Sequence, residues 1–114
     1  MTCETFNNMR GYDLFFKCEV LQRGGSFKIR GATNAILSLS ESEATAGVCT
    51  HSSGNHAQAV ALAAKVRGIK ATIVMPENAP PNKIAAVSGY GAEVILCEAT
   101  NEARQATTDK LVAD

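Results

Sequence analysis

The sequence of 114 residues has no surplus of charge of either sign, because eleven basic residues balance eleven acidic ones. A nucleic-acid-binding protein normally carries a cluster of basic residues, so this class of function is not indicated. Long apolar runs are missing as well. The longest unbroken run, Ala59–Ala64, has six residues, whereas a membrane-spanning helix needs roughly 20. The sequence therefore predicts neither a nucleic-acid-binding protein nor a membrane protein.

A secretion signal and a disulfide framework are also missing. The first ten residues, Met1–Arg10, contain no apolar segment of the kind found in signal peptides. The four cysteines, Cys3, Cys18, Cys49 and Cys97, are far apart and include no C-x-x-C pair, a spacing too wide for a zinc site. The sequence therefore predicts a cytoplasmic protein with free, buried thiols and no metal site.

Several catalytic motifs are absent too. The sequence has no G-x-S-x-G turn of the kind that carries the nucleophilic serine of hydrolases. It also has no G-x-x-x-x-G-K-[ST] loop of the kind that binds a nucleoside triphosphate. Its two histidines, His51 and His56, are five residues apart across a predicted turn and form no H-E-x-x-H pattern. These absences argue against a serine hydrolase, a P-loop enzyme and a zinc protease.

Short apolar runs alternate with longer segments of helical pattern along the chain. The predicted strands are Leu14–Val20, Gly47–His51, Ala71–Met75 and Glu93–Cys97. The predicted helices are Ile29–Ser40, Asn55–Arg67, Asn82–Ser88 and Glu102–Ala113, with a polar connector at Ser40–Ala46. This alternation predicts an α/β fold in which a parallel sheet is covered by helices on both faces, giving three layers.

The turn after the second predicted strand carries two hydroxyls and a glycine. Parallel sheets bind ligands where strands lead into helices, and the free N–H groups of a helix's first turn attract anions. Gly54 lets a ligand approach the backbone, while Ser52, Ser53 and Asn55 add donors. These residues predict an anion site. The same pattern is also typical of an ordinary Ser/Asn helix cap, which is the alternative.

The turn after the first predicted strand carries a lysine at the head of a predicted helix. The positive end of the helix dipole disfavours an ammonium group there, and a neutral amine can condense with an aldehyde. Phe27 beside Lys28 offers an apolar wall, and Gly24 and Gly25 offer a flexible approach. The residues alone leave two interpretations open, a reactive lysine or a solvated surface charge.

Together these turns, S-F-K-I-R-G-A and T-H-S-S-G-N-H-A-Q, resemble the fold-type II pyridoxal-phosphate (PLP) enzymes, in the branch of serine racemase and threonine (serine) dehydratase. The segments L-F-F-K-C-E, I-V-M-P-E-N-A-P-P-N-K and Y-G-A-E-V resemble that branch in the same order. The resemblance implies a truncated, tryptophan synthase β-like PLP fold. Residues 1–45 would form part of the large cofactor domain with the Schiff-base lysine, and residues 46–114 a nearly complete small α/β domain.

The resemblance also implies a role for each matching residue. Lys28 would hold PLP as a Schiff base and move the Cα proton on one face. Ser53 would be the acid/base on the opposite face, Asn55 would bind the cofactor's ring oxygen, and Phe27 would line the cofactor pocket. The substrate's α-carboxylate would be held by one loop, which consists of Ser52, Ser53, Gly54, Asn55 and His56.

An effector nucleotide site at a subunit interface is implied as well, with Gln58 and Tyr90 as the matching residues. The family implies a homodimer that acts on L-serine, D-serine and L-threonine. It also implies Mg²⁺ or Ca²⁺, but the ligands of that metal are not matched in this chain. The glycine-rich loop that holds the PLP phosphate in the family is not matched either.

Three hypotheses follow for the function. The first is a PLP-dependent serine racemase and L-serine (threonine) ammonia-lyase, truncated to an N-terminal fragment with little activity alone. The second is a non-catalytic fragment that associates with a full-length homologue. The third is an unrelated α/β module that binds a small anion at Ser52–Asn55 and does not need Lys28.

Overall fold

The computed structural model describes residues 1–113 and contains a sheet of three parallel strands in the order β1-β2-β3. The strands are β1 (Val48–His51), β2 (Ala71–Pro76) and β3 (Glu93–Cys97). The helices are α1 (Glu4–Arg10), α2 (Lys28–Leu37), α3 (Glu41–Ala46), α4 (Asn55–Arg67), α5 (Pro81–Gly89) and α6 (Asn101–Ala113), with short 3-10 turns at η1 (Glu19–Leu21) and η2 (Arg23–Gly25).

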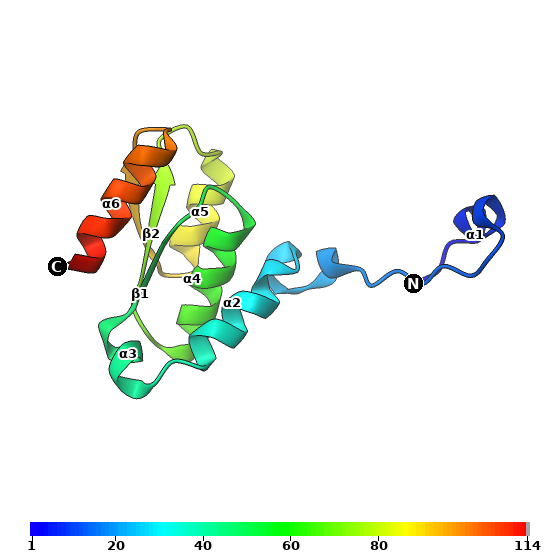
Figure 1. Cartoon of the computed structure of the whole chain (residues 1–114), viewed down its shortest axis with the longest axis horizontal. Coiled ribbons are helices and arrows are strands. Elements are labelled where there is room, and N and C mark those ends of the chain that lie inside the picture. The colour runs from blue at the N-terminus through cyan, green and yellow to red at the C-terminus, as the bar shows by residue number, and fades with distance from the viewer. Residues whose placement is uncertain (114) are drawn as a thin grey trace.

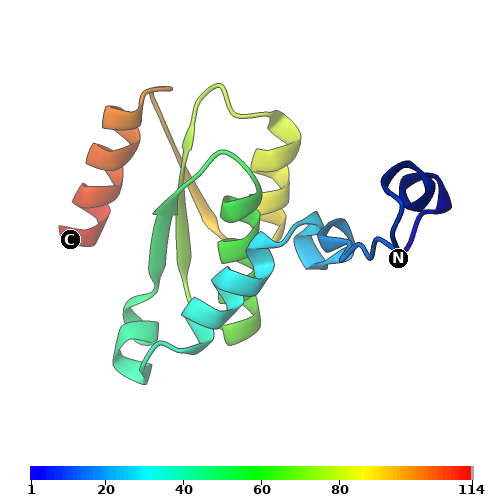
Figure 2. The ribbon, with the colours of Figure 1, turned by 45° about the vertical axis from the view of Figure 1, so that its right-hand side comes forward.

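Helices cover both faces of the sheet. The helices α4 and α5 lie on one face, with α2 packed beside α4, and α6 lies on the other face (Figure 1, and turned in Figure 2). The predicted three-layer α/β fold with a parallel sheet is therefore confirmed. The three strands and the helices α2, α4, α5 and α6 each begin and end within three residues of their predicted bounds.

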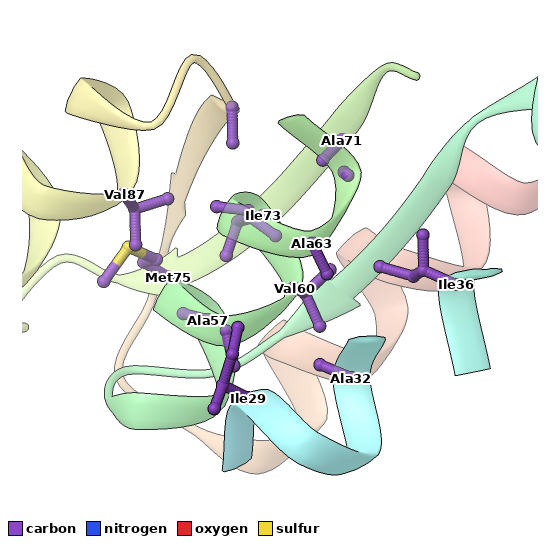
Figure 3. Close-up of a cluster of buried hydrophobic side chains, with 14 of the residues drawn as sticks. Ile29, Ala32, Ile36, Ala57, Val60, Ala63, Ala71, Ile73, Met75 and Val87 are labelled. Carbon is purple, nitrogen blue, oxygen red and sulfur yellow. The ribbon is translucent and has the colours of Figure 1, made fainter. Parts of the chain in front are cut away.

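The alanine-rich helix α4 lies at the centre of the core. Its side chains are buried on several sides at once, because methyl groups let both α2 and the sheet approach closely. On the sheet side it meets β2, whose Ile73 and Met75 are fully buried. On the α2 side it meets Ile29 and Ile36, as Figure 3 shows.

The predicted strand Leu14–Val20 is wrong. The segment has no partner strand and contains only the beginning of the 3-10 turn η1. It belongs to residues 1–27, called the arm below, which extend from the packed body except where η2 contacts α4 (Figure 1), so that its apolar, β-prone side chains have no sheet edge to pair with. Nine large apolar side chains of the arm are exposed: Met1, Phe6, Met9, Tyr12, Phe15, Phe16, Val20, Leu21 and Phe27.

The predicted polar connector Ser40–Ala46 is wrong as well, because most of it is the helix α3. Ser40 and Glu43 form a capping box at its start: the Glu43 N–H donates to the Ser40 hydroxyl at 3.3 Å, and the Ser40 N–H donates to the Glu43 carboxylate at 2.8 Å. The S-x-x-E pattern is the sequence signal of such a box. The short helix α1 was not predicted either.

The four cysteines are free, as predicted, but each is half-buried, so the expectation of buried thiols is wrong. Within residues 1–113, no helix combines the length and apolar character needed to cross a membrane. The division of the chain at residues 45 and 46 stays a prediction, and Asp114, the last residue of the second predicted domain, lies outside the described residues.

Candidate active site

The helices α2 and α4 run side by side in the same direction. At their far ends, Arg67 in the last turn of α4 donates hydrogen bonds to the carbonyl oxygens of Ile36 and Leu39, at the end of α2. At their near ends, Ile29 of α2 packs close to Ala57 of α4 (Figure 3). Because the two helices begin together, the residue at the head of α2 lies beside the turn that leads into α4.

Lys28 is that first residue of α2. Its side chain is exposed, and its Nζ lies 5.2 Å from the centre of the Phe27 ring. The residues before it form the turn η2 rather than the end of a strand, so this part of the prediction is wrong. Its place at the head of a helix is as predicted, and its amine is accessible to an incoming aldehyde.

The turn Ser52–Gly54 connects β1 to α4. The Ser52 N–H donates to the carbonyl of Val74 at 3.0 Å, which extends the pairing with β2 by one residue. The Gly54 N–H then donates to the Ser52 hydroxyl at 3.4 Å, closing the turn. Ser53 is half-buried between them, and within residues 1–113 its hydroxyl makes no hydrogen bond.

The N-terminus of α4 has no side-chain cap. Its N-cap residue is Gly54, which has no side chain to accept a hydrogen bond, and no other side chain of the described chain takes that place. The alternative of an ordinary Ser/Asn cap is therefore wrong. The N–H groups of Asn55, His56 and Ala57 stay available to a ligand with negative charge.

Gly54 leaves room for such a ligand. A Cβ atom built on this residue would meet no protein atom within 4 Å. Packing inside the chain therefore does not require a glycine here, whereas close approach of a ligand to the backbone would.

The electrostatics of the site show at His56, the second residue of α4. Partial burial lowers the pKa of its imidazole, and the positive charges of Lys28 and then His51 lower it further. The imidazole is therefore neutral at pH 7. Lys28 and His51 both lie near the start of α4, because α2 packs beside α4 and β1 ends at His51.

Asn55 has a partner that the sequence did not indicate. Lys83, in the first turn of α5, donates a hydrogen bond from its Nζ to the Asn55 Oδ1 at 3.1 Å. The two residues are 28 positions apart in the chain, so no local pattern could have predicted the contact.

Of the two residues of the predicted nucleotide site, Gln58 lies on α4 and Tyr90 comes directly after α5. Gln58 is only 8% exposed, and its buried Nε2 has no hydrogen-bond partner within residues 1–113. Tyr90 follows α5 and lines a groove of about 260 Å³, together with Ala61 and Lys65 of α4. Gln58 lies one helical turn before Ala61 but is not among the residues that line the groove.

Comparison with known proteins assigns the chain to a family. The family model described as pyridoxal-phosphate dependent enzyme matches residues 1–114. A serine racemase from Dictyostelium discoideum is 54% identical over 112 residues, which are 98% of this chain and 35% of that protein. The chain thus spans about a third of the length of the curated relatives it matches.

Solved structures agree with the family match. The crystal structure of serine racemase from Dictyostelium discoideum superposes with a TM-score of 0.94 at 54% identity, over 99% of this chain and 37% of that one. The processed form of threonine deaminase isoform 2 from Solanum lycopersicum superposes with a TM-score of 0.89 at 41% identity, over 96% of this chain and 32% of that one. The hypothesis of an unrelated anion-binding module is therefore wrong. The chain belongs to the pyridoxal-phosphate dependent enzymes, in the fold-type II branch of the serine racemases and threonine dehydratases.

Proposed function

We propose that this chain carries the reactive lysine and the substrate-carboxylate site of a serine racemase and L-serine (threonine) ammonia-lyase. The observation that supports the proposal is that α2 and α4 run side by side in the same direction and begin together. This arrangement brings the exposed amine of Lys28 beside a helix N-terminus that no side chain caps. The substrates would be small hydroxy amino acids: L-serine, D-serine and L-threonine.

The residues at this site fit part of a PLP molecule. The amine of Lys28 can hold the aldehyde, the amide of Asn55 can donate to the ring oxygen, and Phe27 offers an apolar ring beside Lys28. When bound, PLP supplies an electron-withdrawing ring that stabilises negative charge at the Cα of an amino acid. The chain lacks a match to the family's glycine-rich phosphate loop, so we expect weak binding of the cofactor by this chain alone.

Two groups would move the Cα proton. The Nζ of Lys28 accepts it on one face of the substrate, and the Oγ of Ser53 delivers a proton on the other face, which inverts the centre. Ser53 suits this role because its hydroxyl is half-buried and makes no hydrogen bond to the described residues. In the elimination reaction, the same pair would remove the Cα proton and assist loss of the β-hydroxyl.

The substrate carboxylate would bind at the start of α4. The free N–H groups of its first turn, with the positive end of the helix dipole behind them, attract a carboxylate. The hydroxyls of Ser52 and Ser53 add donors. The imidazole of His56 is neutral at pH 7, so it can also act as a hydrogen-bond donor from one ring nitrogen.

An effector nucleotide site at Gln58 and Tyr90 is part of the proposal. Its support is the unpartnered Nε2 of Gln58 and the groove beside Tyr90. We also propose the family's homodimer, its Mg²⁺ or Ca²⁺ dependence and a cytoplasmic location. The four free thiols are consistent with that location.

An absorption titration tests the main proposal. We expect a visible band when PLP is added to the chain, lost in Lys28→Ala and kept in Lys110→Ala, whose lysine lies on α6 on the other face of the sheet. Formation of D-serine and of pyruvate from L-serine would then give the ratio of racemase to ammonia-lyase activity. An equally strong band in Lys28→Ala would refute the role of Lys28.

The second candidate is a non-catalytic chain that associates with a full-length homologue. The exposed apolar side chains of the arm, residues 1–27, favour it, because such surface is normally covered by protein. Sedimentation of the chain mixed with a full-length serine racemase distinguishes the two candidates. A stable complex, together with no visible band for the chain alone, would support association.

A further inference from the structure

The contact between Lys83 and Asn55 joins the first turns of α5 and α4. Lys83 is half-buried, and its Nζ donates to the Asn55 Oδ1 at 3.1 Å. Asn55 is the first residue of α4 and Lys83 the third residue of α5. The contact therefore depends on the packing of two helices rather than on local sequence.

The chemistry of lysine fixes the orientation of the asparagine amide. An ammonium group has three N–H donors and no acceptor, so it can pair only with the amide oxygen. The Nδ2 of Asn55 must then point away from Lys83. Within residues 1–113 this nitrogen donates to no other group, and both of its hydrogens stay available.

We propose that Lys83 is a positioning residue that turns the Nδ2 of Asn55 toward the ring oxygen of PLP. The proposal rests on the proposed function, because it takes Asn55 as the donor to that oxygen. Without Lys83 the amide can flip, and in the flipped state its oxygen faces another acceptor, which is repulsive. The positive charge of Lys83 also polarises the amide, which strengthens its N–H donors.

The expected size of the effect is that of one hydrogen bond. Loss of the orientation should weaken PLP binding about threefold to tenfold, in line with the net worth of a single hydrogen bond in a protein. The loss should depend on Asn55, because Lys83 acts through that residue.

A double-mutant cycle on the full chain tests this dependence. PLP affinity is measured by absorption for wild type, Lys83→Met, Asn55→Ala and the double variant. We expect Lys83→Met to weaken binding in the wild-type background and to have no effect in the Asn55→Ala background. Lys83→Arg should restore most of the affinity, because a guanidinium is also a pure donor. Lys110→Met is the matched control and should bind as wild type does.

Two results would overturn the proposal. One is an equal loss of affinity in both backgrounds, which would mean that Lys83 acts by its own charge. The other is no loss in Lys83→Met. Far-UV circular dichroism of every variant checks the fold. Lys83→Gln is a second variant: its side chain can accept as well as donate, so it does not fix the orientation of the Asn55 amide.

A measurement without cofactor separates this proposal from the proposed function. The side-chain amide resonances of Asn55 are assigned in a ¹⁵N–¹H spectrum by their loss in Asn55→Asp. We expect Lys83→Met to shift these resonances in the free chain, and Lys110→Met to leave them in place. If the wild-type chain binds no PLP, the proposed function fails for this chain. The Lys83 proposal is then decided by the amide resonances, and unchanged resonances would refute it.

Discussion

Replacing Arg67 by methionine should destabilise the fold by about 2–4 kcal/mol. The guanidinium of Arg67 is 12% exposed and donates to the carbonyls of Ile36 and Leu39, the latter at 2.6 Å. A hydrogen bond to a charged group contributes about 1.5–3 kcal/mol. Water can partly replace the donors at the end of α2, and methionine keeps the apolar stem, so the loss should be less than two full bonds. The ion pair with Glu41 adds little, because that carboxylate is 99% exposed.

Thermal and urea unfolding, followed by circular dichroism, measure this loss. At about 4 °C per kcal/mol for a chain of this size, Tm should fall by about 8–16 °C. Arg67→Lys should lie between wild type and Arg67→Met, because a single ammonium cannot reach both carbonyls as the planar fork does. Arg23→Met, an exposed arginine of η2, is the control and should change stability by less than about 0.5 kcal/mol. A loss that small in Arg67→Met would refute the view that this residue holds the end of α2.

Three further perturbations test the start of α4, the start of α3 and the turn before β1. Lys28→Met should raise the pKa of His56, measured by NMR titration, because it removes one of the positive charges that lower it. Glu43→Gln should remove part of the acid sensitivity of folding below pH 4.5. Hydrogen bonds from Ser40 lower the pKa of Glu43 in the folded chain. The stability that this carboxylate contributes is therefore fully present above pH 4.5, and it is lost as the pH falls through the lower pKa of the folded state. Gly47→Ala should cost more than about 2 kcal/mol in urea unfolding, because φ is +85° and a Cβ would lie 2.9 Å from the Lys70 carbonyl oxygen.

Two of these perturbations have a matched control, and the Glu43 variant has a second variant that should act in the same direction. Lys110→Met should leave the pKa of His56 unchanged, and an equal rise in both lysine variants would contradict the proximity of Lys28. Ser40→Ala removes the hydroxyl partner of Glu43, so it should reduce the acid sensitivity of folding in the same direction as Glu43→Gln. Gly68→Ala, at φ +77° with open space around the Cβ, should cost only about 1–2 kcal/mol. A smaller cost for Gly47→Ala than for Gly68→Ala would show that the clash is relieved.

The elements that the sequence predicted well are those whose pattern reports burial directly. The run of β2, which is apolar except for Thr72, is buried at every residue, as a central parallel strand should be. The helix α4 ends at Gly68, whose left-handed conformation is the C-terminal cap that its position indicated. The run Leu14–Val20 has the same composition as a strand, but a strand forms only where another strand offers its edge. That condition depends on the tertiary arrangement and cannot be seen in the run itself.

The same distinction applies to the site. Lys28 and the turn Ser52–Gly54 were found because each belongs to a short, contiguous motif. Lys83 and Arg67 were not found, because their partners are 28 and 31 residues away in the chain. A side chain that orients another one, as we propose for Lys83, leaves no local pattern, so sequence reasoning finds candidate reacting groups more readily than the groups proposed to hold them in place.

The geometry of helix starts explains why these residues meet. Lys28, Asn55 and Lys83 lie within the first three residues of α2, α4 and α5. In a parallel sheet the helices that follow the strands all begin at the carboxyl ends of the strands. The helix α2 begins there too, because it runs parallel to α4. Positive dipole ends and two lysine side chains therefore gather at this end of the sheet. The pKa of His56, close by, is lowered first by partial burial and then by the charges of Lys28 and His51. Such a site favours ligands that carry several negative groups. An amino acid bound together with pyridoxal is one example, because the first has a carboxylate and the second a ring oxygen.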